Sequence, residues 1–175
     1  MAEDGATSGP LIAPYLATEP SVVMQALELA TVGPEDRLLD LGSGDGRFCV
    51  AACQQYDAAA AVGVELDPIL VERSAAAAQR CGVGDRARFL AADFTSPGFD
   101  PAPLCPGHPA QAFTVVVAFL LPEAEARFTG LLVNLAARGA RVLTIVFQLE
   151  RGGGLQLRGR AGNYVFLYSA APETG

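Results

Sequence analysis

The chain has 175 residues, of which 51% are hydrophobic and 18% charged, and its formal net charge is −7. This length and composition are typical of one globular domain with a sizeable core. The acidic balance argues against extended contact with a nucleic-acid backbone, which needs clusters of Lys and Arg, and favours a basic protein segment or a small molecule as partner.

The apolar runs, the N-terminal residues, and the histidine and cysteines narrow the class of protein further. No apolar run reaches the roughly 18 residues of a membrane span, and the first residues include Glu3 and Asp4 but no Lys or Arg, unlike a targeting peptide. We therefore expect a cytoplasmic protein without membrane contact, either a monomer or a homodimer. His108 and the cysteines lack the spacing of a metal site, and Cys49 and Cys53 are expected to be small core residues.

Helical and strand-like patterns alternate along most of the chain. Residues 1–14 are predicted to be a loose arm, and residues 15–175 a single domain. A helix is predicted to start at Pro20 and to end before Gly33. Apolar strand-like runs follow at residues 37–41, 61–66, 87–93, 113–121 and 140–149.

Further helices are predicted between these runs. One begins near Asp45, one begins at Pro68 and ends at Gly82, and one begins near Pro122 and ends at Gly139. Apolar strands that alternate with helices indicate a parallel sheet covered on both faces. After residue 150, two short runs around a turn at residues 160–162 predict an antiparallel hairpin. The fold class is thus α/β, Rossmann-like, with a seven-stranded, mostly parallel sheet.

One connection breaks the alternation. Residues 94–112 contain five prolines between Pro97 and Pro109, a density that prevents a stable helix. Long loops of this kind in compact domains are usually functional or disordered. Whether this loop closes over a substrate does not follow from the sequence.

The stretch LLDLGSGDG, residues 38–46, places Gly42, Gly44 and Gly46 directly after a predicted strand. Glycines in the first strand–helix loop allow a tight turn and let a ligand contact the backbone. The G-x-G-x-x-G pattern of nicotinamide-binding folds would put its third glycine at position 47, which is Arg47. A nicotinamide oxidoreductase is therefore disfavoured.

Acidic residues lie at the ends of successive predicted strands. Glu65 is placed to accept hydrogen bonds from both hydroxyls of a ribose. Asp40 would attract an amino group, and Asp93 would accept from an adenine amine with Phe94 or Leu66 against the ring, although Asp93 and Asp67 could also be only helix or turn caps. Together these residues predict a nucleoside ligand with a cationic, zwitterionic arm.

These motifs give the chain a clear family resemblance. LLDLGSGDG, VGVELDP and FLAADF resemble the first three motifs of class I S-adenosylmethionine-dependent methyltransferases. The resemblance spans roughly residues 15–149 and extends to the terminal hairpin. It implies S-adenosyl-L-methionine as cofactor and the following cofactor-binding residues: Tyr15, Thr18, Asp40, Gly42, Ser43, Gly44, Gly46, Glu65, Leu66, Asp93 and Phe94.

A narrower resemblance concerns the methyl acceptor. PYLATEPSVVMQALELA, VVVAFLLPEA and RGARVLTIVF are similar to a compact group that includes the lysine methyltransferases of ATP synthase c-subunit and adenine nucleotide translocase. In that group a Tyr-x-Pro-Thr segment closes over the methionine end of the cofactor. Tyr15 and Thr18 match it, but Ala17 replaces the proline. The resemblance implies N-methylation of a protein lysine.

The end of the fourth predicted strand is expected to face the transferred methyl group. Phe119, Leu120 and Pro122 are candidates for an acceptor channel, and no catalytic acid or base is assigned, His108 included. This segment lacks the Asn-Pro-Pro-Tyr type tetrapeptide of methyltransferases that act on nucleic-acid bases or glutamine. Two alternatives stay open: a small-molecule methyltransferase, and a non-catalytic S-adenosylmethionine-binding partner or sensor.

Overall fold

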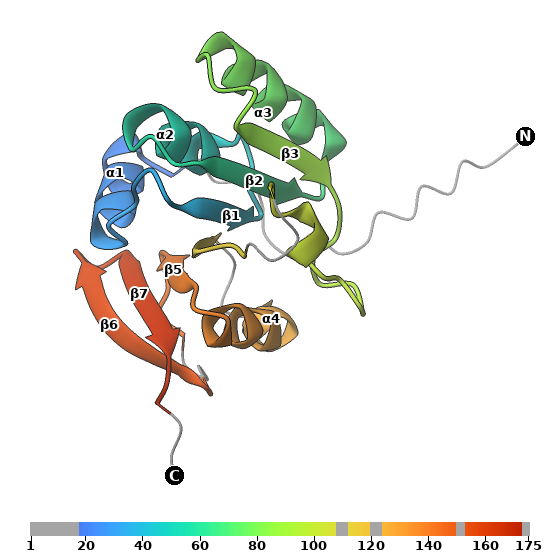
Figure 1. Ribbon diagram of the computed structural model, residues 1–175. Coiled ribbons are helices and arrows are strands. Elements are labelled where there is room, and N and C mark those ends of the chain that lie inside the picture. The colour runs from blue at the N-terminus through green and yellow to red at the C-terminus, as the bar shows by residue number, and fades with distance from the viewer. Residues whose placement is uncertain (1–17, 108–111, 120–123, 150–152, 173–175) are drawn as a thin grey trace, which may run out of the picture.

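A seven-stranded sheet forms the centre of the molecule, in the strand order β3-β2-β1-β4-β5-β7-β6 (Figure 1). The computed structural model describes residues 18–107, 112–119, 124–149 and 153–172. The strands β1 to β5 are parallel to one another, and β7 is antiparallel to both β5 and β6. The predicted fold class, a mostly parallel sheet with a terminal antiparallel hairpin, is confirmed.

The strands are shorter than most of the apolar runs that predict them. Their bounds are β1 Arg37–Leu41, β2 Ala60–Glu65, β3 Ala87–Ala91, β4 Val115–Ala118, β5 Arg141–Ile145, β6 Leu155–Ala161 and β7 Val165–Ala170. The runs at 113–121 and 140–149 extend beyond β4 and β5 because apolar side chains continue into the loops, where Phe113, Phe147 and Leu149 are buried.

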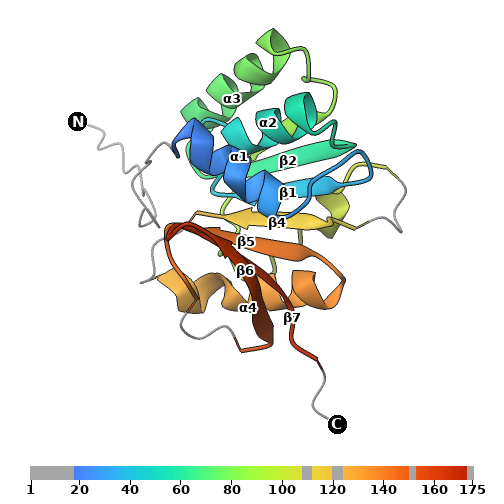
Figure 2. The same cartoon turned by 90° about the vertical axis from the view of Figure 1, so that its left-hand side faces the viewer.

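Helices cover the two faces of the sheet unequally. They are α1 Pro20–Leu29, α2 Arg47–Gln55, α3 Pro68–Arg80 and α4 Glu125–Ala137. Helices α1, α2 and α3 lie on one face and α4 lies on the other (Figure 2). The sequence predicts Pro20 and Pro68 in the first turns, and the side chain of Asp67 caps α3 by accepting a hydrogen bond from Ile69 N (2.8 Å).

The proline-rich connection takes the place of a helix on the α4 face. Its described residues contain one short 3-10 turn, η1 Ala102–Leu104, and are otherwise irregular, as predicted. Phe94 is buried there, and Phe99 and Leu104 pack against the same hydrophobic cluster as Leu39 and Val62 of the sheet. The described part of this loop therefore covers β1 and β2 where a helix would otherwise lie.

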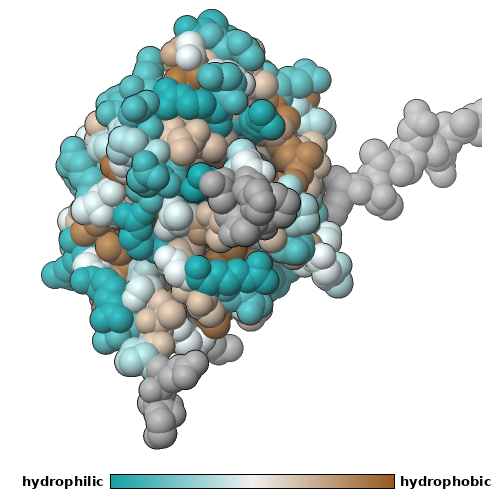
Figure 3. All heavy atoms as spheres, viewed as in Figure 1, coloured by the Kyte–Doolittle hydropathy of each residue, from teal (hydrophilic) through white to brown (hydrophobic). Residues whose placement is uncertain are grey.

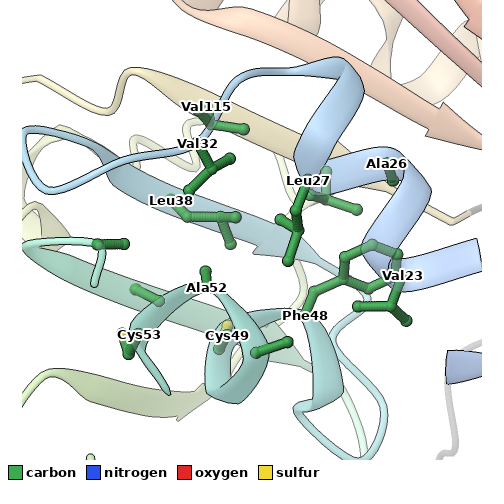
Figure 4. Packing of buried hydrophobic residues seen from close by; sticks show 14 of the residues in the cluster. Val23, Ala26, Leu27, Val32, Leu38, Phe48, Cys49, Ala52, Cys53 and Val115 are labelled. Atoms are coloured by element: carbon green, nitrogen blue, oxygen red, sulfur yellow. The ribbon is translucent and has the colours of Figure 1, made fainter. Parts of the chain in front are cut away.

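Two hydrophobic clusters, one on each face, hold the layers together. On the face of α1 and α2, Val23 and Leu27 pack with Phe48, and Cys49 and Cys53 are fully buried, as predicted (Figure 4). On the opposite face the fully buried side chain of Phe128 belongs to the cluster of α4. The proposed domain limits, 1–14 and 15–175, stay a prediction because residues 1–17 are outside the described ranges.

Candidate active site

The strand order places a ligand site at the carboxyl ends of β1 and β4. The chain runs outward from β1 to β2 and β3 on one side, and to β4 and β5 on the other. At such a reversal the neighbouring loops turn in opposite directions and leave a crevice in which α/β proteins bind ligands. The glycine loop, residues 42–46, leaves β1 at this point.

The loop has the backbone that its glycines predict. Gly42, Gly44 and Gly46 have φ angles of 81°, 53° and 78°, in the left-handed region that L-residues with a side chain rarely adopt. A side chain at Gly46 would also meet the ring of Phe89, at 2.6 Å. The N–H groups of Gly42 and Ser43 donate to Val64 O at 2.9 and 3.1 Å, so the loop is tied to the end of β2.

Glu65, the residue predicted to bind a ribose, also holds this loop in place. Its Oε2 accepts a hydrogen bond from Gly44 N (2.8 Å), and its Oε1 accepts from Leu66 N (2.7 Å) and Asp67 N (3.1 Å). A carboxylate has about four acceptor positions. Glu65 thus connects the glycine loop with the β2–α3 turn, and ribose binding by its remaining acceptor capacity stays a prediction.

Asp40 is a buried carboxyl group at the base of the loop. The residue is 2% exposed and its Oδ2 has no hydrogen-bond partner among the described residues. Burial, with smaller contributions from the charges of Glu65 and Asp45, raises the pKa of Asp40 from 3.8 to about 8. Ser43 Oγ is likewise buried without a partner among these residues.

These two oxygens test whether the site fits the implied cofactor. A buried polar atom without a partner costs free energy, on the order of 1–3 kcal/mol, which a ligand group recovers by bonding to it. The zwitterionic methionine arm of S-adenosylmethionine carries an ammonium group, and a cation beside Asp40 would favour the ionised carboxylate over the protonated form that burial favours. Gly42 and Gly44 add backbone without side chains close to Asp40 in the chain, so the residues present fit the cofactor.

The predicted adenine-binding residues differ in how accessible they are. Asp93 Oδ1 accepts hydrogen bonds from Thr95 N (2.8 Å) and Thr95 Oγ1 (2.6 Å), and these bonds lower the pKa of Asp93. Asp93 therefore caps a turn, the alternative that the sequence left open. Phe94 is buried in the cluster on the α4 face, whereas Leu66 is 39% exposed at the end of β2. Of the two, Leu66 offers the more accessible apolar surface.

The remaining predicted site residues are only partly described. Phe119 directly follows β4 and is partly buried against the cluster formed by α1 and α2. Thr18 lies beside the first turn of α2, where its carbonyl accepts a hydrogen bond from Arg47 Nη1. Tyr15, Leu120 and Pro122 lie outside the described residues.

Arg47 has a role that the sequence did not suggest. Its guanidinium donates to both carboxylate oxygens of Asp45, at 2.8 and 2.5 Å, and also reaches Thr18 O. This side chain joins the segment before α1 to the glycine loop. In the sequence, Arg47 stood out only because it replaces the third glycine of a nicotinamide motif, and nothing marked its contact with Thr18, 29 positions away.

The described ranges hold neither clustered metal ligands nor a membrane-spanning helix. There, no three His, Cys, Asp or Glu side chains are grouped as metal ligands would be. Within the same ranges, every helix is too short or too polar to cross a membrane.

The strand order, the glycine loop after β1 and the acidic residue that ends β2 define a class I S-adenosylmethionine-dependent methyltransferase. The family model described as the ANTKMT methyltransferase domain matches residues 40–152. The chain belongs to this family, and the predicted enzyme class and cofactor are confirmed.

The sequences of two relatives, and one solved structure, match most of the chain. It is 30% identical to the protein-lysine N-methyltransferase of Saccharolobus islandicus over 78% of each chain. It is 32% identical to the mouse lysine N-methyltransferase of ATP synthase c-subunit over 79% of this chain, which spans 51% of the mouse protein's length. The crystal structure of an RNA methyltransferase from Salinibacter ruber in complex with S-adenosyl-L-homocysteine has a TM-score of 0.75 and 30% identity, and the match covers 91% of this chain and 97% of that one.

Proposed function

We propose that the protein transfers a methyl group from S-adenosylmethionine to the side-chain amine of a lysine in another protein. The observation that carries this proposal is the similarity over 78% of the chain to an archaeal relative named as a protein-lysine N-methyltransferase. The mouse relative is named for lysine methylation as well. The proposal does not extend to the particular protein that either relative methylates.

The end of β4 supports an amine acceptor of this kind. Bound S-adenosylmethionine supplies a methyl group on a sulfonium, which needs a nucleophile in line with the carbon–sulfur bond. A lysine must arrive as a neutral amine, and an apolar environment favours that form because it disfavours the ammonium ion. Phe119 supplies apolar surface directly after β4, and positioning of the two reactants accounts for much of the catalysis.

The charge of the protein favours the same class of acceptor. With a net charge of −7, the protein attracts basic segments, and lysines are common in such segments. On the face shown in Figure 3 the surface is mostly hydrophilic, with apolar side chains in small separate groups. Recognition through polar and charged contacts is consistent with that surface.

RNA methylation is the second candidate, because the Salinibacter protein is named an RNA methyltransferase. Binding to a phosphate backbone requires clustered cations, and affinity for nucleic acid grows with the number of phosphates they neutralise. This chain has 12 Lys and Arg residues against 19 Asp and Glu. The charge balance therefore favours protein over RNA.

A labelling experiment separates the two acceptors. The purified protein is incubated with a lysate and S-adenosylmethionine carrying a tritiated methyl group, and the products are divided between protease and ribonuclease treatment. Loss of macromolecular label with protease, and methyl-lysine in the hydrolysate, is the expected result. Label that survives protease but not ribonuclease would refute the lysine proposal. A Glu65→Ala variant, which removes a predicted cofactor ligand, is the background control.

A further inference from the structure

A serine on α3 contacts the glycine loop through its hydroxyl group. Ser74 is fully buried, and the single proton of its Oγ is shared between two acceptors, Gly44 O at 2.9 Å and Leu70 O, one helical turn earlier, at 2.8 Å. The first bond joins residues 30 positions apart in the sequence. The second is the local bond that any helical serine can make to the preceding turn.

The peptide groups of Gly44 are consequently held from two sides. Its N–H donates to Glu65 Oε2 (2.8 Å), and its carbonyl accepts from Ser74 Oγ (2.9 Å). Glycine has the largest backbone freedom of all residues, so an unsupported glycine loop would lose much entropy when a ligand fixes it. The two bonds fix Gly44 before any ligand is present.

Phe89 of β3 closes the same region by packing. A side chain at Gly46 would lie 2.6 Å from the Phe89 ring and 2.8 Å from Ser74 Cβ. A side chain at Gly63 of β2 would lie 2.6 Å from both the same ring and Ser43 Oγ. Phe89 and Ser74 thus pack against the loop, and Phe89 also packs against its supporting strand. Because these side chains fill the space, a residue larger than glycine would not fit at either position.

We propose that Ser74 is a positioning residue for the cofactor: its bond to Gly44 O, backed by the ring of Phe89, keeps the glycine loop in the conformation that binds S-adenosylmethionine. Pre-organised binding surfaces gain affinity because they lose less freedom on binding. The proposal concerns the cofactor only and does not depend on which acceptor is methylated.

The test compares two hydroxyl deletions of matched chemistry. Ser74→Ala removes the bond to Gly44. Thr129→Ala on α4 removes a hydroxyl that donates to the carbonyl one turn earlier, Glu125 O (2.7 Å), as Ser74 does to Leu70. The dissociation constant of S-adenosylhomocysteine is measured by calorimetry for both variants, together with amide hydrogen exchange of residues 41–47.

Ser74→Ala is expected to bind about tenfold more weakly, the factor equivalent to 1.4 kcal/mol, and to exchange the loop amides faster, while Thr129→Ala matches the wild type. Ser74→Cys, with a weaker donor of similar size, is expected to fall between them and serves alone if the alanine variant does not fold. Unchanged affinity and exchange in a folded Ser74 variant, even one with lower thermal stability, would overturn the proposal. A smaller loss in Ser74→Cys than in Ser74→Ala supports the role of the hydrogen bond.

Discussion

Replacing Asp40 by Asn should change how the stability of the protein depends on pH. Burial raises the pKa of Asp40 from 3.8 to about 8, so at neutral pH the folded protein keeps a proton that the unfolded chain releases. Stability is then greatest below the unfolded pKa of 3.8 and falls as the pH rises towards the folded value of about 8. Asn cannot titrate, so the variant lacks this contribution.

The size of the effect follows from the linkage between proton binding and folding. A difference of one bound proton changes the free energy of unfolding by about 1.36 kcal/mol per pH unit. Between pH 5 and pH 7 nearly a full proton separates the two states, so the wild type should lose about 2.5 kcal/mol that Asp40→Asn does not lose. Because the variant serves as the reference, all other titrating groups cancel in this comparison.

Urea denaturation of both proteins at pH 5, 6 and 7 measures this difference without cofactor. Calorimetry with S-adenosylhomocysteine measures the second consequence: the variant should bind more weakly because Asn, unlike Asp40, cannot lose a proton to become the carboxylate that the ammonium group of the ligand favours. If the free energies of unfolding of the wild type and of Asp40→Asn changed equally with pH, the raised pKa of Asp40 would be refuted. Equal affinity for the ligand would show that Asp40 is structural and does not bind the methionine arm.

Three further variants and one chemical probe test other parts of the molecule. Glu65→Ala should weaken S-adenosylhomocysteine binding by at least tenfold in calorimetry, and unchanged affinity in a folded variant would exclude both the ribose contact and the support of Gly44. Asp36→Ala removes a buried carboxylate that pairs with the partly exposed Arg141 at the amino ends of the strands, so denaturation should show a loss of about 3 kcal/mol with unaltered ligand affinity. Val146→Gly should raise the free energy of unfolding by about 1 kcal/mol, since Val146 has a φ of 77° and is 54% exposed; a destabilised variant would contradict the strain. In a thiol-reagent titration, exposed Cys81 should react in the native protein well before the buried cysteines of α2, and equal rates would show that α2 opens readily.

The sequence predicted the glycine loop and its place after the first strand because these signals are local. Three glycines in five residues after an apolar strand specify a loop with positive φ angles, and the structure has that backbone at Gly42, Gly44 and Gly46. An acidic residue at the end of the second strand follows from the repeating strand–helix pattern. Both features need only short-range order and the parallel topology, which hydrophobic periodicity shows.

The residues that the sequence missed act through contacts between distant positions. Ser74 sits in a helix of ordinary composition, and its partner is 30 positions earlier, so nothing local distinguishes it. Gly63 was a usable signal, since an isolated glycine inside an apolar strand indicates close approach of a neighbour. Phe94, predicted as an alternative to Leu66 beside a ligand ring, is buried in the cluster that covers the α4 face, and its contact with a ligand stays a prediction.

The position of β7 also bears on how the protein is made. This strand lies between β5 and β6, although it follows both in the chain. During synthesis the strands that carry the glycine loop can therefore pair first. The outer edge of β5 stays unpaired until residues 165–170 have been made. An unpaired edge is a template for another chain, so a nascent or prematurely terminated product passes through its most aggregation-prone state just before the last strand is added.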